Sequence, residues 1–126
     1  MTLSIPTGVA RPRAVLFDWD NTLVDNWVTI TAALNATFAA FGKPTWTLAE
    51  TKQRVRGSMR ESFPGHFGER WQEAGEIFYR NFRERHLETL TAMPCAAELL
   101  RALEGRGLYL GVVSNKHGPF LRSEAA

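Results

Sequence analysis

Cysteine is nearly absent from this sequence, in which Cys95 is the only one among 126 residues. No disulfide can therefore form within the chain, and the simplest location is a reducing compartment, the cytoplasm. Cys95 follows Pro94 at a predicted helix start. We expect it to be a small, partly buried residue there and not a nucleophile.

Long apolar runs and an excess of one charge are also missing. No stretch approaches the roughly 20 apolar residues of a membrane span, and Met1 to Pro12 read as a loose leader without a signal-peptide block. Fifteen Lys and Arg against 13 Asp and Glu leave a formal net charge of +2. Acids and arginines alternate over 69–88, which favours a solvated helix face over a nucleic-acid surface. We expect neither a membrane nor a nucleic-acid partner, and the oligomeric state stays open.

Two short apolar runs are present instead, at 14–17 and 108–113, and each ends in polar residues. Such runs are typical of strands covered on both faces in a parallel sheet. Periodic apolar positions and capping signals predict helices over 27–41, from Thr47 to about Arg56, over 69–90, from about 95 to 105 or 107, and from near Pro119. The segment 57–68, which contains Pro64, is expected to be a loop or a broken helix.

The stretch between the two predicted strands is much longer than a simple crossover connection needs. This excess predicts an α/β fold with an inserted helical domain. We place the inserted domain, a helical cap, at 24–91 and the sheet-bearing core at 13–23 and 92–126.

Asp18 and Asp20 directly follow the first apolar run. Two carboxylates at this spacing repel each other, and a divalent cation such as Mg²⁺ would relieve the repulsion because it prefers oxygen ligands. One carboxylate could then attack a phosphorus atom while the other donates and accepts a proton. The plainer alternative is a pair of solvated turn residues.

The residues from Phe17 to Asp25, FDWDNTLVD, resemble the first motif, DxDxT, of the haloacid dehalogenase-like hydrolase superfamily. The residues VVSNK at 112–116 resemble its second motif, an apolar strand that ends in serine or threonine. The resemblance implies a Rossmann-like parallel sheet, incomplete here with two core strands, and an inserted α-helical cap.

The resemblance also implies roles for four residues. Asp18 would form an aspartyl-phosphate, and Asp20 would protonate the leaving alcohol and then activate water. The Asp18 carboxylate and the backbone carbonyl of Asp20 would hold Mg²⁺, while Ser114 and Asn115 would bind the phosphoryl group. An aspartate at position 20 favours phosphate ester hydrolysis over carbon–halogen cleavage.

The substrate prediction rests on weaker resemblances. RGSMR at 56–60 is similar to the substrate loop of β-phosphoglucomutase-like caps, so Arg56 and Arg60 could clamp a second anionic group. A solvated helix end is the alternative. The segment from Ser114 to Lys116 is similar to the Thr-Asn-Lys of phosphoglycolate phosphatases, although Lys116 could instead point to solvent. These features predict a small phosphorylated metabolite, an anionic phosphate monoester, with 2-phosphoglycolate the best single candidate.

The superfamily's third-motif lysine and fourth-motif acids have no counterpart in this sequence. We therefore expect an amino-terminal fragment of a longer enzyme, which alone would bind Mg²⁺ poorly and turn over slowly or not at all. Two alternatives remain at this point. One is a sugar-phosphate mutase of the β-phosphoglucomutase type, and the other is a non-catalytic remnant whose cap serves as an interaction module.

Overall fold

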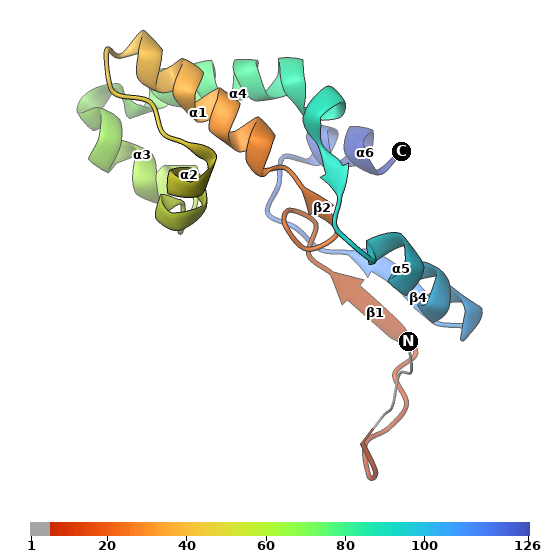
Figure 1. Cartoon of the computed structure of the whole chain (residues 1–126). Coiled ribbons are helices and arrows are strands. Elements are labelled where there is room, and N and C mark those ends of the chain that lie inside the picture. The colour runs from red at the N-terminus through yellow and green to blue at the C-terminus, as the bar shows by residue number, and fades with distance from the viewer. Residues whose placement is uncertain (1–5) are drawn as a thin grey trace.

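The computed structural model describes residues 6–126, so residues 1–5 of the predicted leader lie outside the described part. Residues 6–12 are exposed and belong to no helix or strand, with a turn at residues 7 and 8. The elements that follow are β1 (Ala14–Phe17), β2 (Val24–Asp25), α1 (Trp27–Ala40), α2 (Leu48–Arg54), α3 (Met59–Phe67), η1 (Gly68–Arg70), α4 (Trp71–Thr89), β3 (Thr91–Ala92), α5 (Ala96–Gly105), β4 (Tyr109–Val112) and α6 (Gly118–Ala125). Helices α1 to α4 form one group, while β1, β4 and α5 form another, as Figure 1 shows.

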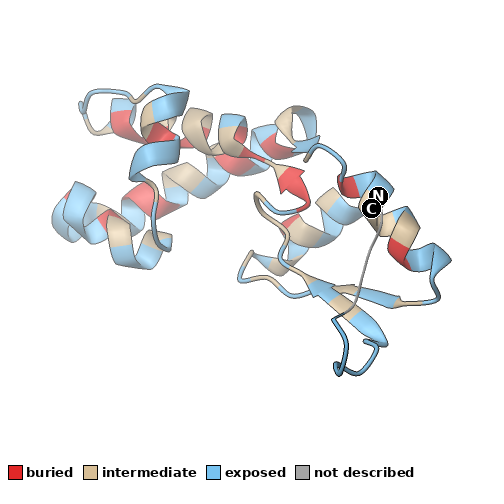
Figure 2. Cartoon of the chain, turned by 60° about the horizontal axis from the view of Figure 1, so that its bottom comes forward, coloured by how far each residue is buried: buried red, intermediate tan, exposed pale blue. Residues whose placement is uncertain are grey.

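The predicted parallel sheet is confirmed, with two strands. β1 pairs in parallel with β4, from Ala14 opposite Tyr109 to Phe17 opposite Val112. The expectation that both faces are covered is wrong for this chain, because Leu16 is 68% exposed and Tyr109 75% exposed. Figure 2 shows the same pale, exposed strands. The reason is that the described residues supply one helix, α5, that packs on β4, and no third strand pairs with either edge.

The helical group has a core of its own. α1 packs along α4, and α3 and α2 pack against α4 and α1 respectively. The core residues are apolar and largely aromatic: Leu34, Phe38, Phe63, Phe67 and Ala74. Leu34 and Phe38, four residues apart, belong to the periodicity that predicted α1, and Phe78 and Phe82, which are also four residues apart, belong to the pattern that predicted α4. These two helices are confirmed within a few residues of the predicted bounds.

The segment 57–68 was predicted as a loop or broken helix, and the structure shows that most of it is the helix α3. Ser58 caps this helix, since its Oγ accepts from the Glu61 amide at 3.3 Å while the Glu61 carboxylate accepts from the Ser58 amide at 3.1 Å. This reciprocal arrangement is a capping box. Burial of Phe63 and Phe67 in the helical core outweighs the cost of Pro64 inside the helix.

We expect Ser58→Ala to lower the free energy of unfolding by about 1 kcal/mol, because one orphan amide at the start of α3 loses its acceptor. Urea unfolding followed by circular dichroism measures the change. Ser123→Ala in α6 is the matched control, because Ser123 is exposed and caps no helix. Equal losses in the two variants would contradict a role for the capping box.

The two short strands β2 and β3 were not predicted. They pair antiparallel, with Val24 opposite Ala92 and Asp25 opposite Thr91. The chain therefore leaves and re-enters the sheet-bearing part through two adjacent segments, which lie between the two groups in Figure 1. Two residues per strand carry too little periodicity to be recognised in sequence.

Two smaller points concern the remaining expectations. Cys95 is exposed, with φ of +65°, so the expectation of partial burial was wrong. Its side chain is exposed because Cys95 lies in the turn that precedes α5.

Within residues 6–126, no helix has the length and apolar character that crossing a membrane requires.

Candidate active site at the ends of the parallel strands

The parallel pairing of β1 and β4 brings the two sequence motifs to one edge of the sheet. The last residues of the strands, Phe17 and Val112, lie opposite each other, and the Val113 amide donates to the Phe17 carbonyl at 2.9 Å. Asp18 directly follows β1, and Ser114 lies two residues after the end of β4. Both residues therefore lie at this edge of the sheet. Ligands of α/β sheets bind at this carboxyl edge.

A tight turn after β1 gives the two aspartates different surroundings. The Asp18 carboxylate is exposed and accepts from the Trp19 amide at 2.8 Å. The Trp19 carbonyl in turn accepts from the Leu23 amide at 3.0 Å, which closes the turn. Asn21 adopts φ of +59° within it, a conformation that asparagine tolerates better than most residues. The turn leaves Asp18 open to a ligand while Asp20 faces the helices.

Asp20 is held by two donors that act on the same oxygen. Its Oδ1 accepts from the Lys116 ammonium at 2.8 Å and from the Asn26 side-chain amide at 2.5 Å. The Asp20 side chain is 32% exposed, whereas Asn26 is only 2% exposed. Among the described residues, the Asn26 Oδ1 is buried with no hydrogen-bond partner. These contacts fix the orientation of the Asp20 carboxyl relative to the strand end.

Lys116 belongs to a buried polar network, so the alternative that it points to solvent was wrong. Its side chain is 6% exposed and pairs with Glu124 at 2.7 Å as well as with Asp20. The side chain of Glu124, on α6, is fully buried and also accepts from the Trp19 indole at 3.0 Å and from His86 Nδ1 at 2.6 Å. Since His86 lies on α4, the network joins the helical group to the strand-end site.

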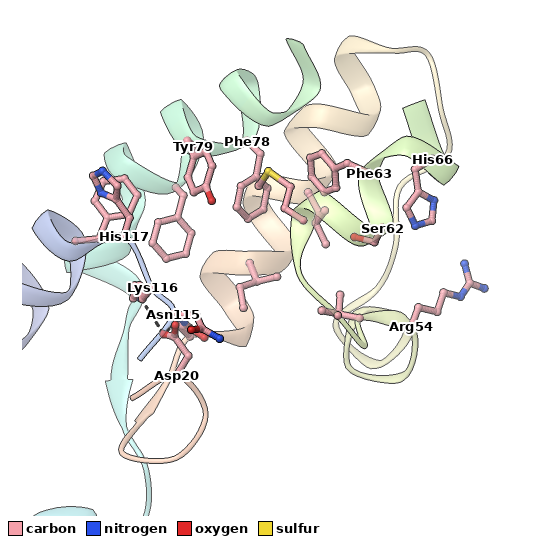
Figure 3. A pocket seen from close by; sticks show the side chains of 18 of the residues that line it. Asp20, Arg54, Ser62, Phe63, His66, Phe78, Tyr79, Asn115, Lys116 and His117 are labelled. Carbon is pink, nitrogen blue, oxygen red and sulfur yellow. Dashed lines mark hydrogen bonds and ion pairs between the residues drawn. The ribbon is translucent and has the colours of Figure 1, made fainter. Parts of the chain in front are cut away.

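A cavity of about 240 Å³ opens from this site toward the helical group. Asp20, Asn115 and Lys116 line one end, and Arg54 and His66 lie at the other, as Figure 3 shows. The lining between these ends is formed mainly by aromatic and aliphatic side chains of α1, α3 and α4. The cavity thus connects a polar end near the aspartates to an apolar interior.

The other predicted site residues lie around this cavity in different ways. Asp18 and Ser114 lie beside it at the strand ends, and neither lines it. The Ser114 hydroxyl accepts from the Lys116 amide at 3.1 Å. Arg56 and Arg60 are exposed and do not line the cavity, so the structure does not bring them to the aspartates.

Sequence reasoning missed Arg54, Asn26 and Glu124. Arg54 lines the cavity, but it pairs with Glu50 at 3.1 Å and lies 5.2 Å from the Trp46 ring centre. Asn26 follows the first motif closely and could have been noticed as a polar residue before an apolar helix. No local signal marks Glu124, because its partners are distant in sequence.

The residues present could supply part of a magnesium site. Asp18 offers an exposed carboxylate, an oxygen donor of the type that Mg²⁺ prefers. The Asp20 carboxylate is already bound by a lysine, which leaves its backbone carbonyl as the group suited to the metal. Over residues 6–126, no cluster of three or more His, Cys, Asp or Glu side chains could enclose a metal ion. The donor set fits the ion in chemistry and needs further ligands from phosphate, water or additional residues.

Residues 15–125 match the family described as haloacid dehalogenase-like hydrolase. The chain belongs to this family. The superfamily resemblance of the two sequence motifs is thereby confirmed, and so is the Rossmann-like α/β fold class.

Curated relatives of this chain include proteins that are named after an enzyme activity. Phosphoglycolate phosphatase from Xanthomonas campestris pv. campestris is 34% identical over 109 residues, which cover 83% of this chain and 49% of that protein. Phosphoglycolate phosphatase 1 from Pseudomonas aeruginosa is 29% identical over 120 residues, which cover 87% and 44% respectively. The chain therefore spans about half the length of the curated relatives it matches.

A solved structure shows the same fold. It is a haloacid dehalogenase-like family hydrolase from Streptococcus pneumoniae, with a TM-score of 0.82 and 23% sequence identity. The match covers 90% of this chain and 54% of the other. At this identity the likeness concerns the fold alone.

Proposed function

We propose that this family member hydrolyses phosphate monoesters, with Asp18 as the nucleophile and Asp20 as the general acid and base. One observation carries the proposal: Asp18 and Ser114 lie at the same carboxyl edge of two paired parallel strands, with Asp20 facing the adjoining cavity. Polar groups that converge beside a cavity are the usual arrangement of an active site.

The proposed reaction has two steps. An Asp18 carboxylate oxygen attacks phosphorus, the bond from phosphorus to the alcohol oxygen breaks, and the proton of Asp20 passes to that oxygen. Water then attacks the aspartyl-phosphate, gives its proton to Asp20 and releases inorganic phosphate with Asp18 regenerated. Ser114 and Asn115 donate hydrogen bonds to the phosphoryl oxygens. Asp20 can serve both steps because Asn26 and Lys116 hold its carboxyl group in one orientation.

Magnesium fits this proposal through the Asp18 carboxylate and the Asp20 carbonyl. When bound, Mg²⁺ neutralises part of the negative charge of the phosphate. Lys116, the cation that pairs with Asp20, also pairs with Glu124 and is therefore poorly placed to neutralise the phosphate alone.

The domain division and the substrate are parts of the same proposal. We place the cap at 24–91 and the core at 13–23 and 92–126, and the adjacent strands β2 and β3 support a boundary there. The names of the curated relatives make 2-phosphoglycolate the first substrate to test. A contribution from Arg56 and Arg60 would require them to move toward the cavity. Location in the cytoplasm also stays a prediction.

The proposal is tested by phosphate release from 2-phosphoglycolate with the complete product of the gene that contains these 126 residues. We expect release that requires Mg²⁺ and is suppressed by a chelator. Release that is indifferent to metal would contradict the magnesium part. A retained phosphoryl group on Asp18 together with isomerised sugar phosphate would instead indicate a mutase, and folded protein without any phosphoryl transfer would indicate a remnant.

For the 126 residues alone we expect slow release or none, because two carboxylates leave the magnesium coordination incomplete. The same assay on the isolated chain checks this. Steady release that is lost in Asp18→Asn would contradict it.

A further inference from the structure

The interior of the cavity beside Asp20 is lined mainly by apolar side chains from four helices, together with the polar side chains of Ser62, Tyr79 and His117. Six of the apolar residues are Ile30 and Leu34 of α1, Phe63 of α3, Phe78 and Phe82 of α4, and Phe120 of α6. We propose that the cavity selects a phosphate monoester whose alcohol part is apolar and aromatic, in preference to the carboxylate-bearing glycolate group. This inference rests on the proposed phosphatase function and names the substrate class of that site.

Charge is the first argument. A carboxylate that enters the apolar interior loses its water and needs a cation or several donors in exchange. Lys116 is committed to Asp20 and Glu124, and it lies at the phosphate end of the cavity. Arg54 lies at the opposite end and pairs with Glu50. The arginines at 56 and 60, on which the anionic prediction depended, do not line the cavity.

The shape and chemistry of the walls are the second argument. Leu34, Phe63, Phe82 and Phe120 are buried, and Phe78 lies between them with its ring 5.8 Å from that of Phe63 and 6.0 Å from that of Phe82. Centroid separations in this range are typical of favourable aromatic contacts, and another ring can extend the same packing. An apolar group that packs against these rings is removed from water.

Size is the third argument. An apolar cavity of about 150 Å³ is large enough to bind benzene, and this cavity measures about 240 Å³. The two-carbon glycolate group would leave much of that space unfilled. The Lys116 ammonium, which pairs with Asp20 at 2.8 Å, lies 4.9 Å from the centre of the Phe82 ring, and Phe78 stacks on Phe82. An aromatic ring attached to an ester oxygen beside Asp20 would therefore lie near these two rings.

The test is carried out on the complete gene product and compares the two ligands within each of two pairs. Benzyl phosphate and 2-phosphoglycolate are both esters of primary alcohols, so the comparison reports mainly on the cavity. We expect kcat/KM to be at least about tenfold higher for benzyl phosphate, a ratio within the range of apolar pockets. We expect benzylphosphonate, which cannot be hydrolysed, to bind at least about tenfold more tightly than phosphonoacetate in calorimetry.

Phe78→Leu should reduce the benzyl preference several-fold in both measurements, taken as the ratio of benzyl phosphate to 2-phosphoglycolate and of benzylphosphonate to phosphonoacetate. Phe41→Leu is the matched control, because Phe41 packs on the same helical core without lining the cavity. Preference for 2-phosphoglycolate and phosphonoacetate, or an equal effect of both variants, would overturn the inference while leaving the phosphatase function intact. Tight benzylphosphonate binding without hydrolysis of either ester would support the cavity assignment and overturn the phosphatase function.

Discussion

Replacing Asp18 by asparagine is expected to lower phosphate release by the complete gene product at least about 1,000-fold, the scale seen when a catalytic nucleophile is removed. A neutral amide has nearly the same shape as the carboxylate, but it cannot attack phosphorus and is a weaker ligand for Mg²⁺. Because Asp18 is exposed, the substitution should leave the fold unchanged. Phosphate release and circular dichroism measure the two quantities.

Asp25→Asn is the matched control for this variant. Asp25 lies in the same motif segment, but its Oδ1 accepts from the Trp27 amide at 3.1 Å, a contact that asparagine can keep. We expect less than a tenfold change in activity, since this contact is structural. Trapping with a rapid quench should detect a phosphorylated wild-type protein and none in Asp18→Asn. Equal activity of the two variants would remove Asp18 from the mechanism.

Replacing Glu124 by alanine is expected to lower the free energy of unfolding by about 3 kcal/mol, the lower end for breaking a buried ion pair. The side chain of Glu124 is fully buried and accepts hydrogen bonds from Lys116, His86 and Trp19. Its removal leaves three donors with one acceptor fewer and opens a gap between α6 and α4. Urea unfolding provides the measurement.

Glu104→Ala is the control, because Glu104 is an exposed acid near the end of α5. Its effect should stay within about 0.5 kcal/mol. Combining Glu124→Ala with Lys116→Met should cost less than the sum of the two single effects, since the lysine is then no longer left with one partner. Additive effects would mean that the pair does not interact.

Most elements could be predicted because their signals are local. The spacing of Leu34 and Phe38 predicted α1, and the apolar run at 14–17 predicted β1. Helix α3 was missed because Pro64 and Gly65 argued against a helix, whereas the capping box at Ser58 and the buried phenylalanines decided for it. Propensity was overridden there by packing that the sequence does not display.

The exposure of the strands shows a second limit. An unbroken apolar run predicted coverage on both faces, yet Leu16 is mostly exposed in this chain. The pattern describes the environment in which a strand is stable, and the neighbours that supply that environment need not lie nearby in sequence.

The residues of the candidate site also divide into those that a short motif predicts and those that depend on tertiary packing. Asp18 and Asp20 could be recognised from one short motif, and Ser114 and Asn115 from another. The burial of Lys116 and the position of Glu124 depend on how α4 and α6 pack, and the absence of Arg56 from the cavity lining depends on where the segment between α2 and α3 lies. No spacing rule within a single segment could have predicted them.

The sequence by itself determined the family, the α/β order of elements and the pair of aspartates after the first strand, because each is encoded within a few neighbouring residues. Only the tertiary structure decided which cation reaches Asp20, which side chains line the cavity and which arginine lies near it. Those features arise where helices α1 to α4, α6 and the strand ends meet, and such contacts depend on side chains that lie far apart along the chain.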